Sequence, residues 1–251
     1  MRRIYLDPAD CEKKYDSISI KGSTFHYLSN VLRMKEGDIF IGFDGSGIEY
    51  EISIKEVENK NIKGIILNIN KIRDIEPAFD IYLFQCIPKS NKMDKIICEV
   101  SQLGVKKIFP VVSSRVVPQI TKENILHKKG RWRRIAVDSS KVAGRDVIME
   151  IEAPVKFDEA IKLPADLKII FWEKADISLR TAINNLQRLK EGASINIFIG
   201  PEGGYTDEEV CLAEEYKAIS VSMGKRILRV ETASVIAVAL TIYELENKLI
   251  P

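Results

Sequence analysis

The sequence lacks any long apolar segment, and its first residues do not resemble a secretory signal. No stretch approaches the roughly 20 consecutive apolar residues that cross a bilayer. The opening residues, Met-Arg-Arg-Ile-Tyr-Leu-Asp-Pro, include two arginines but no apolar core after them. We therefore expect a cytoplasmic protein that does not associate with membranes.

Residues that commonly bind metals are few and scattered. The two histidines, His26 and His127, lie far apart, and no pair of cysteines has the spacing of a zinc site. The four cysteines are Cys11, Cys86, Cys98 and Cys211. We expect reduced, mostly buried thiols and no metal ion.

Net charge is also small, but it is unevenly distributed. The chain has a formal net charge of +2, while basic residues gather between Arg115 and Arg145. The basic residues inside this stretch are Lys122, His127, Lys128, Lys129, Arg131, Arg133, Arg134 and Lys141. Such a stretch on a near-neutral protein suggests a phosphate-binding surface. Taken alone, a solvated helix face is the simpler explanation.

The chain has enough apolar residues for a core, and its pattern changes once. Hydrophobic residues make up 45% of the 251 residues, which suits one large domain or two small ones. Up to about residue 72, short strands such as Ile39–Phe43 are followed by turns such as Asp44-Gly45-Ser46-Gly47. This pattern predicts a small antiparallel barrel or sandwich, with one helix near 24–32.

After Ile75-Glu76-Pro77, apolar strands alternate with amphipathic helices. We expect strands at 80–87, 105–112, 167–172, 195–199 and 218–222. We expect helices at 93–103, 121–143, 157–163, 177–189, 207–216 and 232–248. This alternation predicts a parallel sheet covered on both faces and a domain boundary near 73–77.

Two glycine-bearing runs follow strand-like segments near the end of the chain. The first is Ile199-Gly200-Pro201-Glu202-Gly203-Gly204, and the second is Met223-Gly224-Lys225-Arg226-Ile227-Leu228-Arg229. Ligands of open parallel sheets bind beyond the carboxyl ends of the strands. Glycine allows a close approach to the main chain, whose N–H and C=O groups can contact an adenine edge or ribose hydroxyls.

The two runs do not match the common phosphate-binding motifs. The first is not Gly-x-Gly-x-x-Gly, and neither run ends in Gly-Lys-Ser/Thr. Glu202 would also place a negative charge near a pyrophosphate. A cofactor without phosphates, such as S-adenosylmethionine (SAM), fits better. Two ordinary β-turns are the alternative.

The two runs also resemble a known family. Phe198–Gly204 together with Met223–Ala233 is similar to the paired signature of the SPOUT-class, trefoil-knotted methyltransferases. More narrowly, the chain resembles the family that methylates N3 of a uridine in 16S ribosomal RNA. Further matches occur at Tyr27–Asp38, Phe43–Gly45, Lys92–Asp94, Ser101–Val105 and Ser114-Arg115.

The resemblance implies a fold, a cofactor and partners. Residues 1–72 would form a PUA-like antiparallel β-barrel that binds RNA. Residues 76–251 would form a trefoil-knotted α/β SPOUT domain with a mostly parallel sheet, which binds SAM and forms a homodimer. The last helix, apolar around most of its circumference, would be buried partly in the core and partly in the dimer interface. The implied cofactor-binding residues are Phe171, Glu173, Ile199, Gly200, Pro201, Gly203, Met223, Gly224, Ile227 and Leu228.

The chain departs from the family pattern at one place. Members commonly carry a Glu-Gln-Ser/Cys-x-Arg-like run, where this chain has Lys141-Val142-Ala143-Gly144-Arg145. The arginine is kept, but the Glu and Gln are not. Contacts with RNA or across the dimer would differ here.

Catalysis at uridine N3 requires that its proton leave and that the resulting negative charge be stabilised. Arg229, directly after the second run, is the first candidate for the stabilising cation. Arg145, supplied across a dimer interface, is the second. Glu202 or Glu231 would accept the proton or fix an arginine. Glu202 would alternatively cap the helix that opens near Thr206-Asp207.

The arginines expected to contact RNA are Arg2, Arg3, Arg33, Arg115 and Arg133. Ribosomal RNA of the small subunit is the expected partner. Two alternatives stay open: a SPOUT methyltransferase for another RNA position, such as a ribose hydroxyl, and an RNA-binding ribosome-assembly protein without catalysis.

Overall fold

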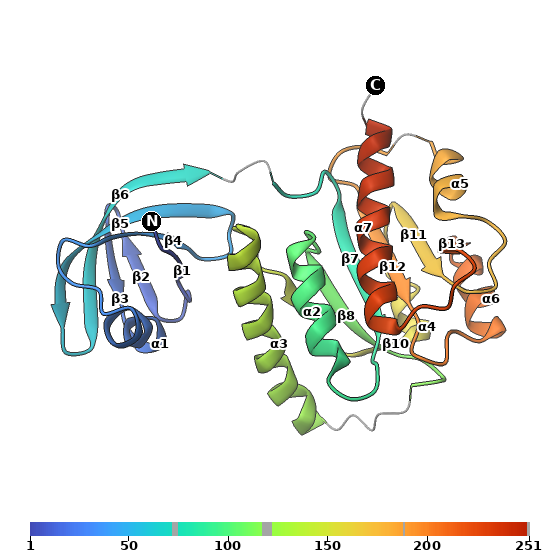
Figure 1. The fold of residues 1–251 in the computed structure, drawn as a ribbon, viewed down its shortest axis with the longest axis horizontal. Coiled ribbons are helices and arrows are strands. Elements are labelled where there is room, and N and C mark those ends of the chain that lie inside the picture. Colours follow the sequence, from blue (N-terminus) through green and yellow to red (C-terminus); the bar gives the residue numbers. More distant parts are fainter. Residues whose placement is uncertain (72–74, 117–121, 188, 250–251) are drawn as a thin grey trace. The chain divides into compact units, whose positions relative to one another are not determined.

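The computed structural model describes residues 1–71, 75–116, 122–187 and 189–249. The chain divides into two compact units (Figure 1). The first contains Met1–Ile75 and Ser140–Ile148, and the second contains Glu76–Ser139 and Met149–Pro251. We had expected residues 140–148 in the second domain, but their contacts group them with the first.

The first unit is built on one six-stranded sheet. Its order is β1-β4-β5-β6-β3-β2, and all pairs are antiparallel except β1 with β4. Within the described residues, no pairing joins β1 to β2, so the sheet is a half-barrel. The strands are β1 (Arg3–Tyr5), β2 (Cys11–Lys14), β3 (Ser17–Ile20), β4 (Ile39–Phe43), β5 (Ile48–Glu58) and β6 (Asn61–Lys71). The helix expected near 24–32 is present as α1 (Gly22–His26) and the π-helical turn η1 (Tyr27–Val31).

The long β5–β6 hairpin gives this unit its core. Alternate residues such as Ile52 and Ile54 point inward and are fully buried with Phe40 and Leu28. Register shifts in the β5–β6 pairing, one of them between Glu51 and Ile52, bend the hairpin, as β-bulges do. The alternation of the sequence therefore becomes a sheet that curls around one apolar cluster.

The segment 140–148 is attached to the first unit by main-chain and side-chain contacts. Ser46 and Val147 form an antiparallel bridge, and the Gly47 N–H donates to the Asp146 carbonyl at 3.3 Å. Gly45 lies so close to Ile148 that an added Cβ would be 3.0 Å from its side chain. The Asp44–Gly47 turn is thus a docking surface for a segment nearly 100 residues away in sequence.

The second unit contains a sheet whose recorded pairs are all parallel, as expected. Its order is β10-β8-β7-β12-β11-β13, with β9 also paired to β8. The strands are β7 (Asp80–Cys86), β8 (Lys107–Val112), β9 (Glu150–Ile151), β10 (Val155–Lys156), β11 (Leu167–Phe171), β12 (Ser194–Ile199) and β13 (Ala218–Val221). The helices are α2 (Lys92–Gln102), α3 (Lys122–Ala143), α4 (Phe157–Ala160), α5 (Leu179–Asn184), α6 (Asp207–Glu215) and α7 (Val230–Leu249).

Helices cover both faces of this sheet (Figure 1). On one face, Phe84 and Phe198 stack with ring centroids 4.5 Å apart and form a cluster with residues of α4 and α6. On the other face, α7 packs on β12 and lies beside α2 and α5. Burial on both faces explains the continuous apolar runs of the strands. None of the helices in the described ranges has the length and apolar character needed to span a bilayer.

Candidate functional site

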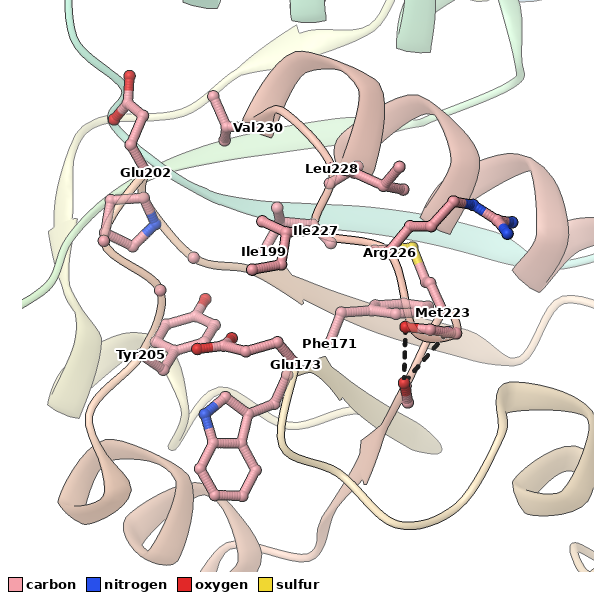
Figure 2. A pocket seen from close by; sticks show the side chains of 18 residues that line it. Phe171, Glu173, Ile199, Glu202, Tyr205, Met223, Arg226, Ile227, Leu228 and Val230 are labelled. Atoms are coloured by element: carbon pink, nitrogen blue, oxygen red, sulfur yellow. Dashed lines mark hydrogen bonds between the residues drawn. The ribbon is translucent and has the colours of Figure 1, made fainter.

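A pocket lies where three neighbouring parallel strands end. Strands β12, β11 and β13 are adjacent, and the loops that follow them enclose a cavity of about 230 Å³ (Figure 2). Every residue that the family resemblance assigned to the cofactor lines this cavity. The other lining residues are Trp172, Glu202, Gly204, Tyr205, Ser222, Arg226, Val230 and Ala233. The two glycine runs, predicted to meet, therefore do meet.

Apolar side chains form much of the wall. Phe171 and Ile199 are buried where their strands end, whereas Ile227 is 91% exposed. Figure 2 shows Ile227 and Leu228, from the loop after β13, beside Ile199, which ends β12. An isoleucine this exposed at the edge of a cavity is an apolar surface available to a flat ligand.

The first glycine run has a conformation that its sequence requires. The Gly204 N–H donates to the Pro201 carbonyl at 2.9 Å, which closes the turn. Gly204 has φ +66°, and an added Cβ would lie 2.9 Å from Glu173 Oε1. At Gly200 an added Cβ would lie 3.3 Å from the Gly204 main chain. Larger residues would therefore strain or push apart this wall.

Charged groups hold the same turn from outside the cavity. Arg115 Nη1 donates to the Gly203 carbonyl at 2.6 Å and to the Tyr205 carbonyl at 3.4 Å. Glu202 Oε1 accepts from the Lys89 N–H at 3.0 Å and from Lys92 Nζ at 2.8 Å. Sequence reasoning missed both lysine contacts, because nothing in the local pattern brings these residues together.

The proposed capping role of Glu202 is wrong. Helix α6 begins after Thr206, whose side chain accepts from the Glu209 N–H at 3.2 Å. Glu209 in turn accepts from the Thr206 N–H at 3.0 Å, which completes a capping box. The Thr-x-x-Glu spacing was the sequence signal for this cap. Glu202 instead faces the start of α2.

The second glycine run is a looser turn. Ser222 Oγ accepts from the Gly224 N–H at 3.1 Å, one of the dashed lines in Figure 2. Gly224 has φ +107°, and an added Cβ would meet nothing within 4 Å. Its glycine is therefore needed for backbone conformation and not for space. Arg226, which was not predicted, also lines the cavity, and Figure 2 shows its guanidinium directed away from Ile199 and Glu173.

The catalytic candidates are not gathered in the cavity. Arg229 is exposed next to Leu228, and its carbonyl accepts from the Ala233 N–H at 2.8 Å at the start of α7. The side chain of Glu231 is 12% exposed, with Oε2 4.0 Å from Lys92 Nζ. Arg145 is 2% exposed and belongs to the first unit.

The arginines predicted to bind RNA differ in their surroundings. Arg2, Arg33 and Arg133 are exposed. Arg3 is engaged by carboxylates of Glu49 and Asp146, and Arg115 donates to the Gly203 carbonyl of the first glycine run. Residue type therefore did not separate the partly buried Arg3 from the exposed arginines, which include Arg115.

The pocket offers apolar walls, main-chain groups and few charges. Glu173 places an exposed carboxylate at its edge, and Trp172 has a buried Nε1–H with no hydrogen-bond partner among the described residues. The described part of the chain contains no group of three or more side chains arranged for a metal ion. These features suit a flat organic ligand with hydrogen-bonding edges and a positive charge.

Comparisons with known proteins agree with this geometry. Residues 75–242 match the family model of an RNA methyltransferase domain, and residues 20–67 match an RNA methyltransferase PUA domain. Ribosomal RNA small subunit methyltransferase E of Buchnera aphidicola (subsp. Acyrthosiphon pisum) is 31% identical over 240 residues, covering 94% of this chain and 90% of that protein. The protein of the same name from Bacillus subtilis is 27% identical over 237 residues, covering 92% and 91%.

Two solved structures are similar along almost the whole chain. A Legionella pneumophila protein in complex with SAM has a TM-score of 0.83 at 27% identity, covering 95% of this chain and 96% of that one. Ribosomal RNA small subunit methyltransferase E from Neisseria gonorrhoeae, bound to SAM, has a TM-score of 0.80 at 26% identity, covering 96% of each chain. The chain therefore belongs to the family of RNA methyltransferases with a PUA domain and an RNA methyltransferase domain, the SPOUT-class group that includes ribosomal RNA small subunit methyltransferase E.

Proposed function

We propose that this chain transfers the methyl group of SAM to N3 of a uridine in the 16S ribosomal RNA of the small subunit. One observation carries the proposal: the loops after β11, β12 and β13 bring all the expected cofactor residues into a single cavity. The relatives named above and their SAM-bound structures support the same reaction class.

The residues of the cavity suit SAM. The apolar side chains of Ile199, Ile227 and Leu228 fit an adenine ring, and main-chain groups near Gly200 and Gly224 fit its edge and the ribose hydroxyls. Among the residues that the structure describes, nothing accepts from the buried Trp172 Nε1–H, and such a donor is costly unless a ligand or water accepts from it. When bound, SAM supplies a methyl group on a sulfonium that leaves as a neutral thioether.

The chain's own groups would align the base and stabilise charge. Arg229 is the first candidate cation for the negative charge that develops on the uracil oxygens, because it directly follows Leu228 of the cavity wall. Arg145 is the second candidate. Glu202 is a weak proton acceptor: burial would raise its pKa, but hydrogen bonds from Lys92 and the Lys89 N–H bring the pKa below its ordinary value of 4.5.

The remaining elements would bind RNA and a second copy. Exposed Arg2, Arg33 and Arg133 are candidate phosphate contacts, and the PUA-like unit is the expected RNA-binding domain. On α7, Leu240 is 39% exposed and Tyr243 is 59% exposed. These apolar side chains support burial of α7 in a homodimer. We propose a cytoplasmic location, which a ribosomal RNA substrate supports.

Mass spectrometry of nucleosides tests the proposal. Small-subunit RNA from cells lacking this protein should lose one 3-methyluridine, and the purified protein with SAM should restore it on free 16S RNA or on assembled subunits. Loss of a 2′-O-methylated nucleoside instead would establish the ribose alternative. An unchanged nucleoside profile, with no calorimetric binding of SAM at millimolar concentration, would establish the non-catalytic alternative.

Arg229→Ala tests the assigned cation. We expect methyl transfer to fall by roughly 100-fold or more, the usual effect of removing a group that stabilises transition-state charge. SAM affinity should stay unchanged, because Arg229 is not part of the cavity lining. Lys225→Ala removes an exposed cation from the same loop and is the matched control. Wild-type turnover by Arg229→Ala would overturn the assignment.

A further inference from the structure

One ammonium group lies between two carboxylates just outside the cavity. Lys92 Nζ is 2.8 Å from Glu202 Oε1 and 4.0 Å from Glu231 Oε2. The side chains of Lys92, Glu202 and Glu231 are 35%, 26% and 12% exposed, respectively. We call this cluster the Lys92 clasp; Lys92 itself is not among the catalytic candidates, and the cluster lies partly shielded from solvent.

The clasp joins three segments that are far apart in sequence. Lys92 begins α2, Glu202 is in the turn after β12, and Glu231 is in the first turn of α7. Strands β7 and β12 are neighbours, so the loops that follow them meet at one edge of the sheet. Glu202 and Val230, which precedes Glu231, both line the cavity, whereas Lys92 does not. In Figure 2 the Glu202 carboxylate points away from Ile199 and Met223.

The carboxylates of Glu202 and Glu231 require the positive charge of Lys92 beside them. Glu231 Oε2 is buried and has no hydrogen-bond partner in the part of the chain that the structure describes, so Lys92 at 4.0 Å provides its compensating charge. Glu202 is also held by the main-chain N–H of Lys89 at 3.0 Å. Without Lys92, two carboxylates of like sign would share this edge of the cavity, and each would repel the other.

We infer that Lys92 is a positioning residue, which holds the 200–204 turn against the start of α7 and thereby sets the affinity of the cavity for SAM. The inference rests on the proposed function. It requires no contact between Lys92 and the cofactor. Its effect acts through Glu202 on one wall and through Glu231 and Val230 on another.

Calorimetric titration with SAM at pH 7.5 tests the inference. Lys92→Met, which keeps the length of the side chain, should raise the dissociation constant roughly 10-fold, the scale of one charge-assisted hydrogen bond. Lys92→Arg keeps the charge and should bind within about 3-fold of wild type, a margin set by the different geometry of a guanidinium. Lys95→Met is the matched control, because Lys95 is on the same helix and pairs only weakly, at 3.8 Å, with Glu99. It should bind SAM as wild type does.

A second substitution separates a clasp from general loosening of the fold. Adding Glu202→Gln to Lys92→Met removes the repulsion and should recover part of the lost affinity, so the two changes should not be additive. The difference in SAM affinity between Lys92→Met and wild type should also become smaller as the pH falls from 7.5 towards 4.5, the ordinary pKa of Glu202. Protonation of Glu202 ends the repulsion between the two carboxylates. A purely structural defect would show neither effect.

The outcomes distinguish this inference from the proposed function. If the wild-type protein does not bind SAM, the proposed function fails. If the wild type binds and Lys92→Met binds equally well, or if the double variant is simply additive, the clasp is refuted. Should Lys92→Met not fold, Glu231→Gln and Lys92→Arg carry the test. Glu231→Gln removes the carboxylate that links Lys92 to the start of α7 and should raise the dissociation constant of SAM roughly 5- to 10-fold, whereas Lys92→Arg should stay within about 3-fold of wild type. Wild-type SAM affinity of Glu231→Gln would refute the clasp.

Discussion

Arg3 is predicted to stabilise the first unit and not to bind RNA. Its Nε donates to Glu49 Oε1 at 2.7 Å, and its Nη2 donates to the Arg145 carbonyl at 2.7 Å and to Asp146. The guanidinium also lies 4.0 Å from the centre of the Phe43 ring. The side chains of Arg3, Glu49 and Asp146 are 15%, 7% and 2% exposed. Removing the cation leaves two buried carboxylates without it.

The expected cost of Arg3→Met is large. Breaking a buried ion pair by removing one partner costs about 3–5 kcal/mol. Both tryptophans, Trp132 and Trp172, belong to the second unit, so their fluorescence would not report this loss. Hydrogen exchange of the β4 amides, which pair with β1, measures it directly. Arg2→Met, which removes an exposed guanidinium bonded to the Leu32 carbonyl at 3.1 Å, should leave this exchange unchanged.

The pH dependence of stability tests the same role of Arg3 independently. Burial raises the pKa of the Asp146 carboxyl above its ordinary value of 3.8, although Arg3 beside it acts in the opposite direction. Without Arg3 this pKa rises further, because the cation favours the ionised form. A carboxyl whose pKa is raised by folding destabilises the folded state above its unfolded pKa. The loss of stability caused by Arg3→Met should thus be largest at neutral pH and become smaller as the pH falls towards 3.8.

Measurements of RNA binding can refute the structural role of Arg3. If Arg3→Met leaves β4 exchange unchanged at pH 7 and weakens RNA binding as much as Arg2→Met does, Arg3 is a phosphate contact and the structural role is wrong. An equal decrease in the salt dependence of RNA affinity in Arg3→Met and Arg2→Met would also identify Arg3 as a phosphate contact. Each lost phosphate contact lowers the slope of log affinity against log salt concentration by about one.

Three further predictions concern the second unit. Arg115→Met should weaken SAM binding roughly 10-fold, because it removes the hydrogen bond to the Gly203 carbonyl that holds the 200–204 turn. Unchanged SAM affinity together with a lower salt dependence of RNA binding would contradict this prediction. Gly204→Ala should cost about 1–2 kcal/mol of backbone strain in thermal unfolding and also weaken SAM binding, because φ is +66° and the Cβ would meet Glu173. Gly192→Ala, at φ +78° in open space, should share only the loss of stability. Burial raises the pKa of the Cys86 thiol to about 12. A thiol reagent at pH 8 should therefore label the exposed Cys211 and leave Cys86 unmodified, which peptide mapping would show. Labelling of Cys86 in the folded protein would disprove its burial.

The periodic elements of the second unit were predictable from local sequence. Apolar runs such as Ile195–Ile199 became buried strands, and Thr206 with Glu209 marked the start of α6. Shorter or more polar elements were not specifically expected. Strand β2, Cys-Glu-Lys-Lys, has no apolar alternation, and it is a strand because β3 pairs with it. Its structure depends on a partner and not on its own residues.

The segment 140–148 shows the same dependence at the level of domains. Residues 140–143 are the end of the long helix α3, so continuity with that helix predicted the segment in the second domain. Its residues instead contact the Asp44–Gly47 turn and Arg3, and Arg3 and Asp146 are 143 residues apart. Such a pairing leaves no periodic signal, because each residue by itself is an ordinary charge.

The glycines that line the cavity were recognisable in the sequence for the opposite reason. The sequence assigned Gly200, Gly203 and Gly224 to the cofactor, because a glycine after a strand points to a role of the backbone itself. Gly224 does have a positive φ, and Gly200 leaves little space for a side chain. A charged side chain carries no comparable information, since its role depends on which opposite charge the fold brings to it. Lys92 and Glu202 are 110 residues apart, and Arg115 and Gly203 are 88 apart. Arg3 and Arg115 resembled RNA contacts in the sequence, and the fold gives both of them partners within the chain. Arg115 is nevertheless exposed, as are Arg2, Arg33 and Arg133, and these four are the candidates to test on RNA.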